Sequence, residues 1–348
     1  MAARCQSQDS QDLPGSPTKP ARSKATVWPW GTANGPSAHA KGQPNVANIG
    51  GVEVQRVIEW LGPMKTVDEM FPDTPAESWT DDLAPHYWVP ETRAYRAAIQ
   101  TWVLRSNDRT VLIDTGVGND RDRPQVPSLA RLSTDFLARL ADAGVRPEDV
   151  DVVVNTHIHY DHVGWNTRLD GGRWVPTFPN ARYLVPEADY EYFRPENAER
   201  MRSPRTEDER ARFEGIRLVF ADSVAPIAAA GQLQTWTGSY QVDARLRLEP
   251  APGHTPGSSV AWLGDQNGAV FVGDLVHTPI QLLRPSDSCA FDLDADAARR
   301  SRRAVLTAAA RASATVLPAH FAGQGAVTLT IGDDDEPTLG RWAQFPAI

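Results

Sequence analysis

The chain has 348 residues, 41% of them hydrophobic and 23% charged, which is close to the average of soluble globular proteins and allows a full hydrophobic core. No apolar run reaches the roughly 18 residues that a membrane-spanning helix needs, and a net charge of −9 argues against a nucleic-acid-binding protein that relies on phosphate contacts. The two cysteines, Cys5 and Cys289, are too few for a disulfide framework or a thiolate zinc site, so the sequence indicates a soluble protein without membrane or nucleic-acid partners.

The first 45 residues differ from the rest because they combine six prolines with many serines and glycines and few aliphatic residues. A segment of this composition buries too little apolar surface to offset the entropy of ordering it. It also lacks the apolar core of a secretory signal peptide, although a targeting role is an alternative. We therefore expect a disordered extension over residues 1–45, one catalytic domain over residues 46–348 and a cytoplasmic location.

After the extension, the sequence predicts alternating strands and helices. Two β-rich runs, 97–104 and 110–113, flank a turn signal at 106–108 and predict a hairpin. Apolar residues with helical spacing predict a helix over 129–143, which ends at Gly144.

The rest of the chain continues this mixed pattern. The run of valines at 152–154 is typical of a short strand buried on both faces, and the charged stretch 194–215 indicates an exposed helix. The remaining expected elements are strands at 183–185, 246–248, 259–263, 269–272 and 315–317 and helices at 186–193 and 295–310. The chain is therefore predicted to belong to the α/β class.

The valine strand is followed directly by the densest group of metal-ligand residue types, in the segment 156–162. On a loop at a strand end, His157 and His159 can turn to one side while Asp161 and His162 turn to another. Imidazole and carboxylate ligands together suit zinc, with iron, manganese and cobalt as alternatives. The competing interpretation, a solvated turn with chance histidines, does not account for four ligand-type residues at this density.

Three further candidate ligands follow strands farther along the chain. His254 lies in a loop rich in proline and glycine just past a strand, Asp274 ends the next strand, and His320 follows the last expected strand. A polar group at a buried strand end costs free energy unless a partner compensates its desolvation, and a metal ion provides that compensation. We therefore interpret all three as metal ligands.

These motifs resemble those of the metallo-β-lactamase-fold hydrolase superfamily, from about Val52 to Phe321. The resemblance implies a four-layer αβ/βα sandwich and a centre of two divalent metal ions. It also implies a division of the ligands, with His157, His159 and His254 on one metal, Asp161, His162 and His320 on the other, and Asp274 bridging the two. Asp114, in a turn similar to the family's Asp-Thr-Gly turn, would orient the metal-binding loop.

The resemblance implies a mechanism as well. Two metal ions a short distance apart lower the pKa of a bridging water toward neutrality, so that hydroxide forms without a strong base. That hydroxide would attack a carbonyl or phosphoryl centre while one metal polarises the substrate oxygen. Asp161 would both bind a metal and orient the nucleophile. We expect two zinc ions per chain.

Within the superfamily, the segments 156–166, 273–277 and 318–321 are most similar to the quorum-quenching lactonase and methyl parathion hydrolase-like branch. This implies hydrolysis of lactones or related carboxylic esters, with aryl phosphotriesters as a further class. Acyl-homoserine lactonases typically have a tyrosine three residues after the bridging aspartate, where this chain has His277. His277 would donate to a substrate oxygen or protonate the leaving group, or else only support a neighbour through a hydrogen bond.

Two other enzyme classes remain open on the same ligands: a glyoxalase II-type thioesterase and an iron-dependent oxidoreductase. Aromatic residues on both sides of the motifs bear on the choice. We expect one group to cap the metals, namely Trp174, Phe178, Tyr183, Tyr190, Tyr192, Phe193, Phe213 and Trp236. We expect an upstream group to form the facing wall or the contact of a homodimer, namely Met70, Phe71, Trp79, His86, Tyr87 and Trp88. Their apolar character favours a small apolar ester or lactone over a glutathione thioester, which would need arginine or lysine contacts.

Overall fold

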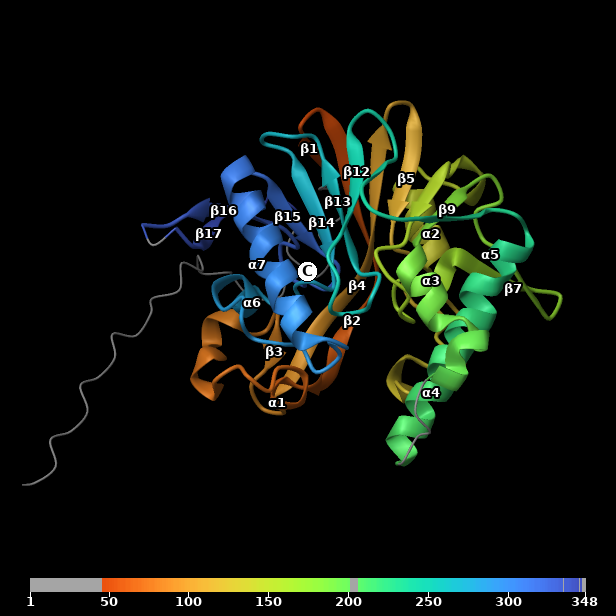
Figure 1. Cartoon of the computed structure of the whole chain (residues 1–348), viewed down its shortest axis with the longest axis horizontal. Helices are drawn as coiled ribbons and strands as arrows, with labels where there is room; N and C mark the ends of the chain where they lie inside the picture. The colour runs from red at the N-terminus through yellow and green to blue at the C-terminus, as the bar shows by residue number, and fades with distance from the viewer. Residues whose placement is uncertain (1–45, 201–205, 334, 344, 346–348) are drawn as a thin grey trace, which may run out of the picture.

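Two β-sheets lie face to face at the centre of the molecule (Figure 1). The computed structural model describes residues 46–200, 206–333, 335–343 and 345. The first sheet has the strand order β1-β2-β4-β5-β6-β9-β10, with β3 paired to β4. Its strands are β1 Val46–Ile49, β2 Val52–Thr66, β3 Trp88–Val89, β4 Ala94–Ser106, β5 Arg109–Ile113, β6 Val152–Val154, β9 Arg182–Pro186 and β10 Leu233–Trp236.

The second sheet is built from the C-terminal half of the chain, in the order β11 to β17. Its strands are β11 Tyr240–Gln241, β12 Leu246–Pro250, β13 Ser259–Leu263, β14 Ala269–Gly273, β15 Thr315–Pro318, β16 Val327–Ile331 and β17 Pro337–Trp342. A separate hairpin consists of β7 Thr167–Asp170 and β8 Arg173–Pro176.

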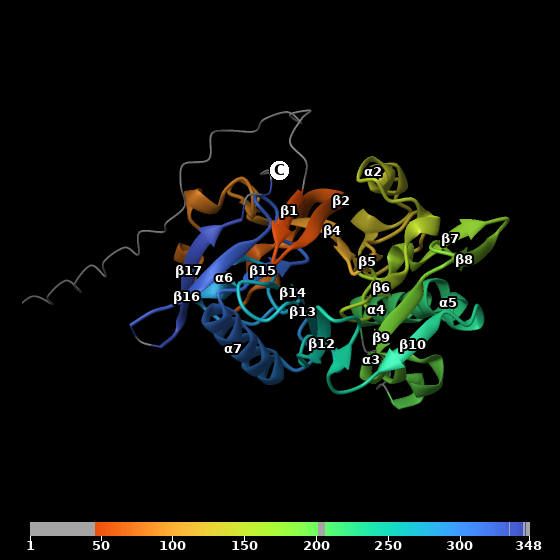
Figure 2. The ribbon, with the colours of Figure 1, turned by 90° about the horizontal axis from the view of Figure 1, so that it is seen from above.

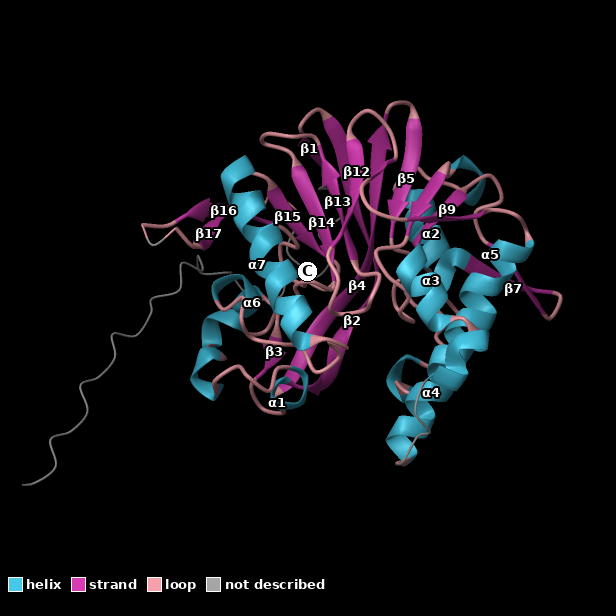
Figure 3. Ribbon diagram, viewed as in Figure 1, coloured by secondary structure: helices cyan, strands magenta, loops and turns pink. Residues whose placement is uncertain are grey.

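The helices lie outside the two sheets (Figure 3). They are α1 Val67–Met70, α2 Phe136–Asp142, α3 Glu187–Phe193, α4 Glu207–Val219, α5 Ala225–Ala229, α6 Pro279–Leu283 and α7 Ala295–Ala312, and a π-helical turn, Phe220–Val224, joins α4 to α5. Asp294 caps the long helix α7, because its side chain accepts a hydrogen bond from the Ala297 N–H.

Alternating side chains divide the core into separate apolar layers. In β13, Ala261 and Leu263 pack between the two sheets, whereas Val260 and Trp262 point the other way and pack in one cluster with Leu306 of α7. The cluster between the sheets takes members from both, including Val111 of β5 in the first and Phe271 of β14 in the second.

The outer face of the first sheet carries its own helices. Phe136 and Leu140 of α2 and Ile227 of α5 pack against Leu112 and Val153. The order of layers is therefore helix, sheet, sheet, helix, with α2 and α5 on one outer side and α7 on the other (Figure 2). This confirms the expected four-layer αβ/βα sandwich.

The predicted hairpin is confirmed as β4 and β5, which pair antiparallel up to Ser106 and Arg109. Asn107 and Asp108 between them have positive φ values of 48° and 59°, the backbone conformation that a tight two-residue hairpin turn requires. The other expected strands and the helices at 186–193 and 295–310 also form, with bounds that differ by a few residues.

The predicted helix over 129–143 is wrong in its first half, because α2 begins only at Phe136. Arg131 has a φ of 52°, and its N–H donates to the Arg121 carbonyl at 2.7 Å. The Thr134 N–H donates to the Asn119 side chain at 2.8 Å. Tertiary hydrogen bonds to the loop at 119–121 thus replace the helical ones.

The charged stretch 194–215 is only partly one helix. It contains a 3₁₀ turn at Pro195–Arg200 and the first part of α4, and residues 201–205 between them lie outside the described residues. The expected extension over residues 1–45 also lies outside them. In the part of the chain that the structure describes, no helix has both the length and the apolarity that crossing a membrane requires.

Half of the expected aromatic cap is buried core instead, namely Phe178, Tyr183, Phe193 and Trp236. Phe178 and Tyr183 pack between the first sheet and its helices, Trp236 packs between the two sheets, and Trp174 lies over the Arg121 guanidinium at 4.2 Å. The upstream group is likewise mostly buried against the second sheet, including Met70, Phe71, Trp79, Tyr87 and Trp88. Those five side chains are therefore not available for a dimer contact.

Candidate metal centre

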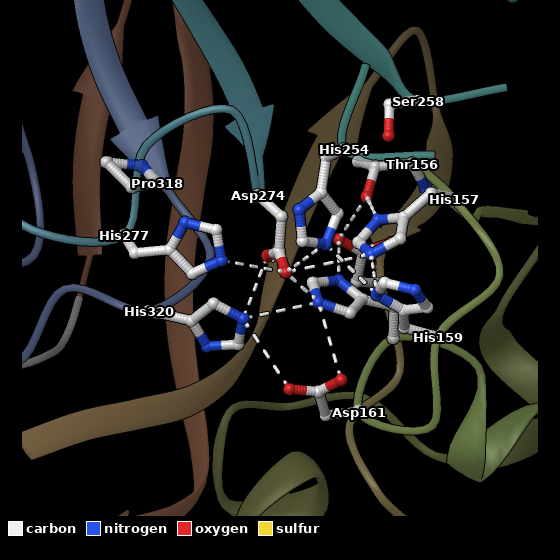
Figure 4. A network of polar contacts seen from close by, with 12 residues as sticks. Thr156, His157, His159, Asp161, His254, Ser258, Asp274, His277, Pro318 and His320 are labelled. Atoms are coloured by element: carbon white, nitrogen blue, oxygen red, sulfur yellow. Dashed lines mark hydrogen bonds and ion pairs between the residues drawn. The ribbon is translucent and has the colours of Figure 1, made fainter. Parts of the chain in front are cut away.

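Four loops at one edge of the sandwich carry the predicted ligands. The segment with His157, His159, Asp161 and His162 follows β6, whereas the loops with His254, Asp274 and His320 follow β12, β14 and β15. Because β14 and β15 are parallel neighbours, their carboxyl ends meet at the same edge of the second sheet. The structure thereby brings all seven predicted residues together (Figure 4).

The first group consists of His157, His159, His254 and Asp274, whose ligand atoms lie within 4.8 Å of one another. His159 is central, because its Nδ1 atom lies 3.0 Å from Nε2 of His157 and 3.0 Å from Nε2 of His254. Loops from two different sheets therefore bring three ring nitrogens together, a donor set that suits zinc and similar divalent ions.

The second group consists of Asp161, His162 and His320. The Nε2 atoms of His162 and His320 lie 3.3 Å apart, and the Asp161 carboxylate lies 3.8 Å and 3.6 Å from these two nitrogens. All three side chains are buried.

Asp274 stands between the two groups. Its Oδ1 atom lies 3.0 Å from Nε2 of His162 and 2.8 Å from Nε2 of His320. Its Oδ2 atom lies 3.1 Å from Nε2 of His254 and 3.7 Å from Nε2 of His157. One carboxylate oxygen of Asp274 thus faces each group.

Hydrogen bonds fix the ring nitrogens that point away from the centre. Each of four histidines places Nδ1 next to an oxygen: His157 to Thr156 Oγ1 at 3.1 Å, His162 to Asp114 at 2.9 Å, His254 to Asp292 at 3.0 Å and His320 to the Ala98 carbonyl at 2.9 Å. With the proton on Nδ1, the Nε2 atom carries a lone pair toward the centre. The donor set therefore fits divalent cations.

The electrostatics of the cluster point the same way. Burial and the nearby His162 lower the pKa of His157 well below its usual value, so it stays neutral. Burial acts on His162 too, but the carboxylates of Asp274 and Asp114 outweigh it and raise the pKa of His162 well above its usual value. The cluster thus stabilises positive charge near Asp274, which is the charge that bound cations supply.

Asp114 holds the loop over residues 156–162 in place through hydrogen bonds, which agrees with the orienting role expected for it. Its carboxylate accepts hydrogen bonds from the Thr156 N–H and hydroxyl, both at 2.8 Å, besides its contact with His162. Its own φ of 57° lies in the left-handed region that aspartate tolerates better than most residues.

The sequence matches the family described as the Metallo-beta-lactamase superfamily over residues 95–320. The chain belongs to this superfamily. As a member that keeps both histidine and aspartate groups, it is a metal-dependent hydrolase. No curated protein sequence matches the chain.

Solved structures share the fold at low sequence identity. The hydrolase AbOPH of the beta lactamase superfamily has a TM-score of 0.70 at 22% identity, over 88% of this chain and 97% of that one. A probable metal-dependent hydrolase from Staphylococcus aureus has a TM-score of 0.68 at 18% identity, over 85% of this chain and 98% of that one. AidC, a dizinc quorum-quenching lactonase in complex with a homoserine product, has a TM-score of 0.64 at 18% identity, over 86% of this chain and 98% of that one.

His277 also reaches the centre of this superfamily member. Its Nε2 atom lies 3.2 Å from Asp274 Oδ2 and 3.8 Å from Cys289 Sγ, and its ring stacks on His320 with an interplanar angle of 17°. Asp274, His277 and His320 form a third group of ligand atoms within 4.8 Å. The Nδ1 atom of His277, however, is buried without a hydrogen-bond partner, which distinguishes it from the four histidines with fixed tautomers.

Two supporting residues have no sequence motif that marks them. Asp292, in the loop before α7, contacts His254 and also accepts a hydrogen bond from the Cys289 N–H at 3.0 Å. Asp189, in α3, accepts from the Ile158 N–H at 2.8 Å. Both act across long sequence distances, so only the folded arrangement identifies them.

Proposed function

We propose that this hydrolase uses two divalent metal ions, most suitably zinc, to open lactones or to cleave related carboxylic esters, with aryl phosphotriesters as a further substrate class. The observation that carries the proposal is the position of Asp274, with one oxygen toward each histidine group. His157, His159 and His254 would hold one ion, Asp161, His162 and His320 the other, and Asp274 both.

When bound, such ions supply a hydroxide at neutral pH and polarise the substrate oxygen. The protein's own residues would do the rest. The Asp161 carboxylate, which is 6% exposed, would hold the nucleophilic water in line with the substrate carbonyl. His277 would donate a hydrogen bond from Nε2–H to the leaving oxygen as that oxygen gains negative charge, because with no partner on Nδ1 the favourable place for its proton is Nε2, facing Asp274. The proton that the leaving oxygen takes up would come from the attacking water, by way of Asp161.

The surroundings of the site support an apolar substrate. The Phe193 ring lies 6.1 Å from the His159 ring and 4.9 Å from the ring of Tyr192, which is 36% exposed. Phe71, which is fully buried, lies 6.2 Å from the His277 ring. An acyl or aryl group that packs on the exposed part of the Tyr192 ring would bury apolar surface. AidC, which shares the fold, is a lactonase, in agreement with this substrate class.

The proposal is tested by metal analysis and a substrate panel on the purified protein. We expect two zinc ions per chain and hydrolysis of acyl-homoserine lactones, simple lactones or aryl esters, compared with methyl parathion and lactoylglutathione. Bound iron that cycles with oxygen would contradict hydrolysis, and preference for lactoylglutathione would favour a thioesterase.

The matched variants are Asp274→Ala and, as a control, Asp170→Ala, whose side chain is 61% exposed on the β7–β8 hairpin. We expect Asp274→Ala to lower metal content and to reduce hydrolysis by more than about 100-fold. Removing a residue that only hydrogen-bonds to a metal ligand costs up to about 100-fold, and the loss of a ligand itself should cost more. Asp170→Ala should retain both. Full activity in Asp274→Ala would refute the assignment of this residue.

A further inference from the structure

Asp189 is a buried carboxylate whose hydrogen bonds all lead to the loops of the first histidine group. It lies in α3, is fully buried, and accepts hydrogen bonds from the Ile158 N–H at 2.8 Å, the Thr255 hydroxyl at 2.8 Å and the Gly257 N–H at 2.5 Å. A buried carboxylate with three donors is held in a single orientation, because losing any of them would leave charge unsatisfied.

These donors belong to two loops that come from different sheets. Ile158 lies between His157 and His159 in the loop after β6, whereas Thr255 directly follows His254 in the loop after β12. One side chain therefore joins the two loops that carry the three histidines of the first group.

The packing around Asp189 shows that the contact is built closely. A Cβ atom on Gly257 would lie 2.5 Å from the Asp189 backbone nitrogen and 2.7 Å from its Oδ1 atom, so only glycine allows this approach. The same two loops are also joined directly by Ser259, whose N–H and hydroxyl donate to the Thr156 carbonyl at 3.0 Å and 2.8 Å.

The second group depends on other partners. His162 is held by Asp114 and His320 by the Ala98 carbonyl, whereas the hydrogen bonds of Asp189 lead to Ile158, Thr255 and Gly257 and to none of Asp161, His162 and His320. Loss of Asp189 should therefore loosen one group and spare the other. A residue that only stabilises the fold would not discriminate between them.

We propose that Asp189 is a positioning residue that sets the spacing between the His157–His159 loop and the His254 loop, and thereby the metal affinity of the first group. This inference rests on the proposed function only in that both require metal binding at these histidines. It assigns Asp189 no contact with substrate.

The test is a cobalt titration of the whole protein, followed by visible absorption and by direct metal analysis, with Asp189→Asn as the variant. Asparagine keeps the shape of the side chain, but its NH₂ group cannot accept the hydrogen bonds that Ile158, Thr255 and Gly257 donate to Asp189. We expect one of the two cobalt ions to bind about 10- to 100-fold more weakly, as for other hydrogen-bond partners of metal ligands, while the other keeps its affinity. The absorption bands of the weakened ion should change.

The matched control is Asp222→Asn, which alters a second buried carboxylate that pairs with Arg121 and Arg123, each at 2.8 Å. We expect it to lower the melting temperature and to keep both cobalt affinities. Thr255→Val removes one donor from Asp189 and leaves the carboxylate itself in place. It should therefore weaken cobalt binding at the same ion by a smaller factor. This variant also decides the question if Asp189→Asn does not fold.

Equal weakening of both ions in Asp189→Asn, or unchanged affinities in Asp189→Asn or Thr255→Val, would overturn the proposal. A wild-type protein that binds fewer than two cobalt ions would overturn it as well. If the wild type binds two ions and hydrolyses no lactone or ester, the proposed substrate class fails while the comparison of affinities still decides the role of Asp189.

Discussion

At the scale of single residues, the outward ring nitrogens distinguish four of the proposed metal ligands from His277 in the same cluster. His162 and His254 each place Nδ1 against a carboxylate, which fixes the proton there and leaves Nε2 free for a cation. His277 has no such acceptor, and burial is the main influence that lowers its pKa. It is therefore a neutral side chain whose Nε2 atom is better suited to donate than to coordinate.

This difference leads to a prediction for His277→Phe. Phenylalanine can keep the stacking on the His320 ring, but it has no N–H to donate to the leaving oxygen. We expect two bound metals and a rate of hydrolysis lower by about 100-fold or more, the range for removing one donor to a developing negative charge. Metal analysis and kcat measurements check this.

Two outcomes would contradict it. Loss of one metal from His277→Phe would show that the third ligand group, with Asp274 and His320, binds a cation. An unchanged kcat would show that His277 acts only as a hydrogen-bond partner of Asp274. Substrates with a better leaving group should reduce the effect, because their leaving oxygen carries charge that needs less stabilisation in the transition state.

At the scale of elements, the sequence predicts the place of each proposed ligand at a strand end more reliably than it predicts the residues that support that ligand. Asp274 and His320 each follow a short apolar strand, and local pattern suffices to locate such strands. The start of α2 was not predictable, because Arg131 and Thr134 use their N–H groups for bonds to another loop. Asp292 was not predictable either, because its contact with His254 spans 38 residues.

A second prediction concerns how α7 is attached to the segment after α1. The Asp73 carboxylate accepts a hydrogen bond from the Ser288 hydroxyl and lies 2.9 Å from Nη2 of Arg299 in α7. These contacts, the Ser288 hydrogen bond first, lower the pKa of Asp73 below its usual 3.8. The stabilisation is therefore present above pH 3.8 and lost as the pH falls through the lower folded-state value.

Asp73→Asn should accordingly unfold at a lower urea concentration than the wild type. The difference between the two urea midpoints should be constant from pH 8 to pH 5. Below pH 3.8 it should shrink, because the wild-type carboxyl then becomes protonated as well. The effect will be modest, since the Asp73 side chain is 44% exposed and solvent weakens such ion pairs. A difference in urea midpoint of the same size at pH 3 would contradict this explanation.

At the scale of the whole molecule, the site exists only where the two sheets meet. His162 and His320 lie 158 residues apart in the chain, yet their Nε2 atoms lie 3.3 Å apart. Each half of the sandwich supplies part of both proposed metal sites, so we expect that neither half binds the two metals alone. Metal binding should therefore stabilise the packing of one sheet on the other, because a ligand that binds only the folded state favours it.

The same reasoning predicts the result of removing residues 1–45. All seven proposed ligands and both sheets lie within the described residues, which begin with β1 at Val46. We expect the shortened chain, 46–348, to bind two metals and to melt within about 2 °C of the full chain, equivalent to under about 1 kcal/mol. A longer truncation, which removes residues 1–51, should melt clearly lower, because β1 pairs with β2 and places Ile49 in the core between the sheets. Calorimetry and metal analysis of both truncations check this, and equal losses in the two would show that residues 1–45 belong to the folded domain.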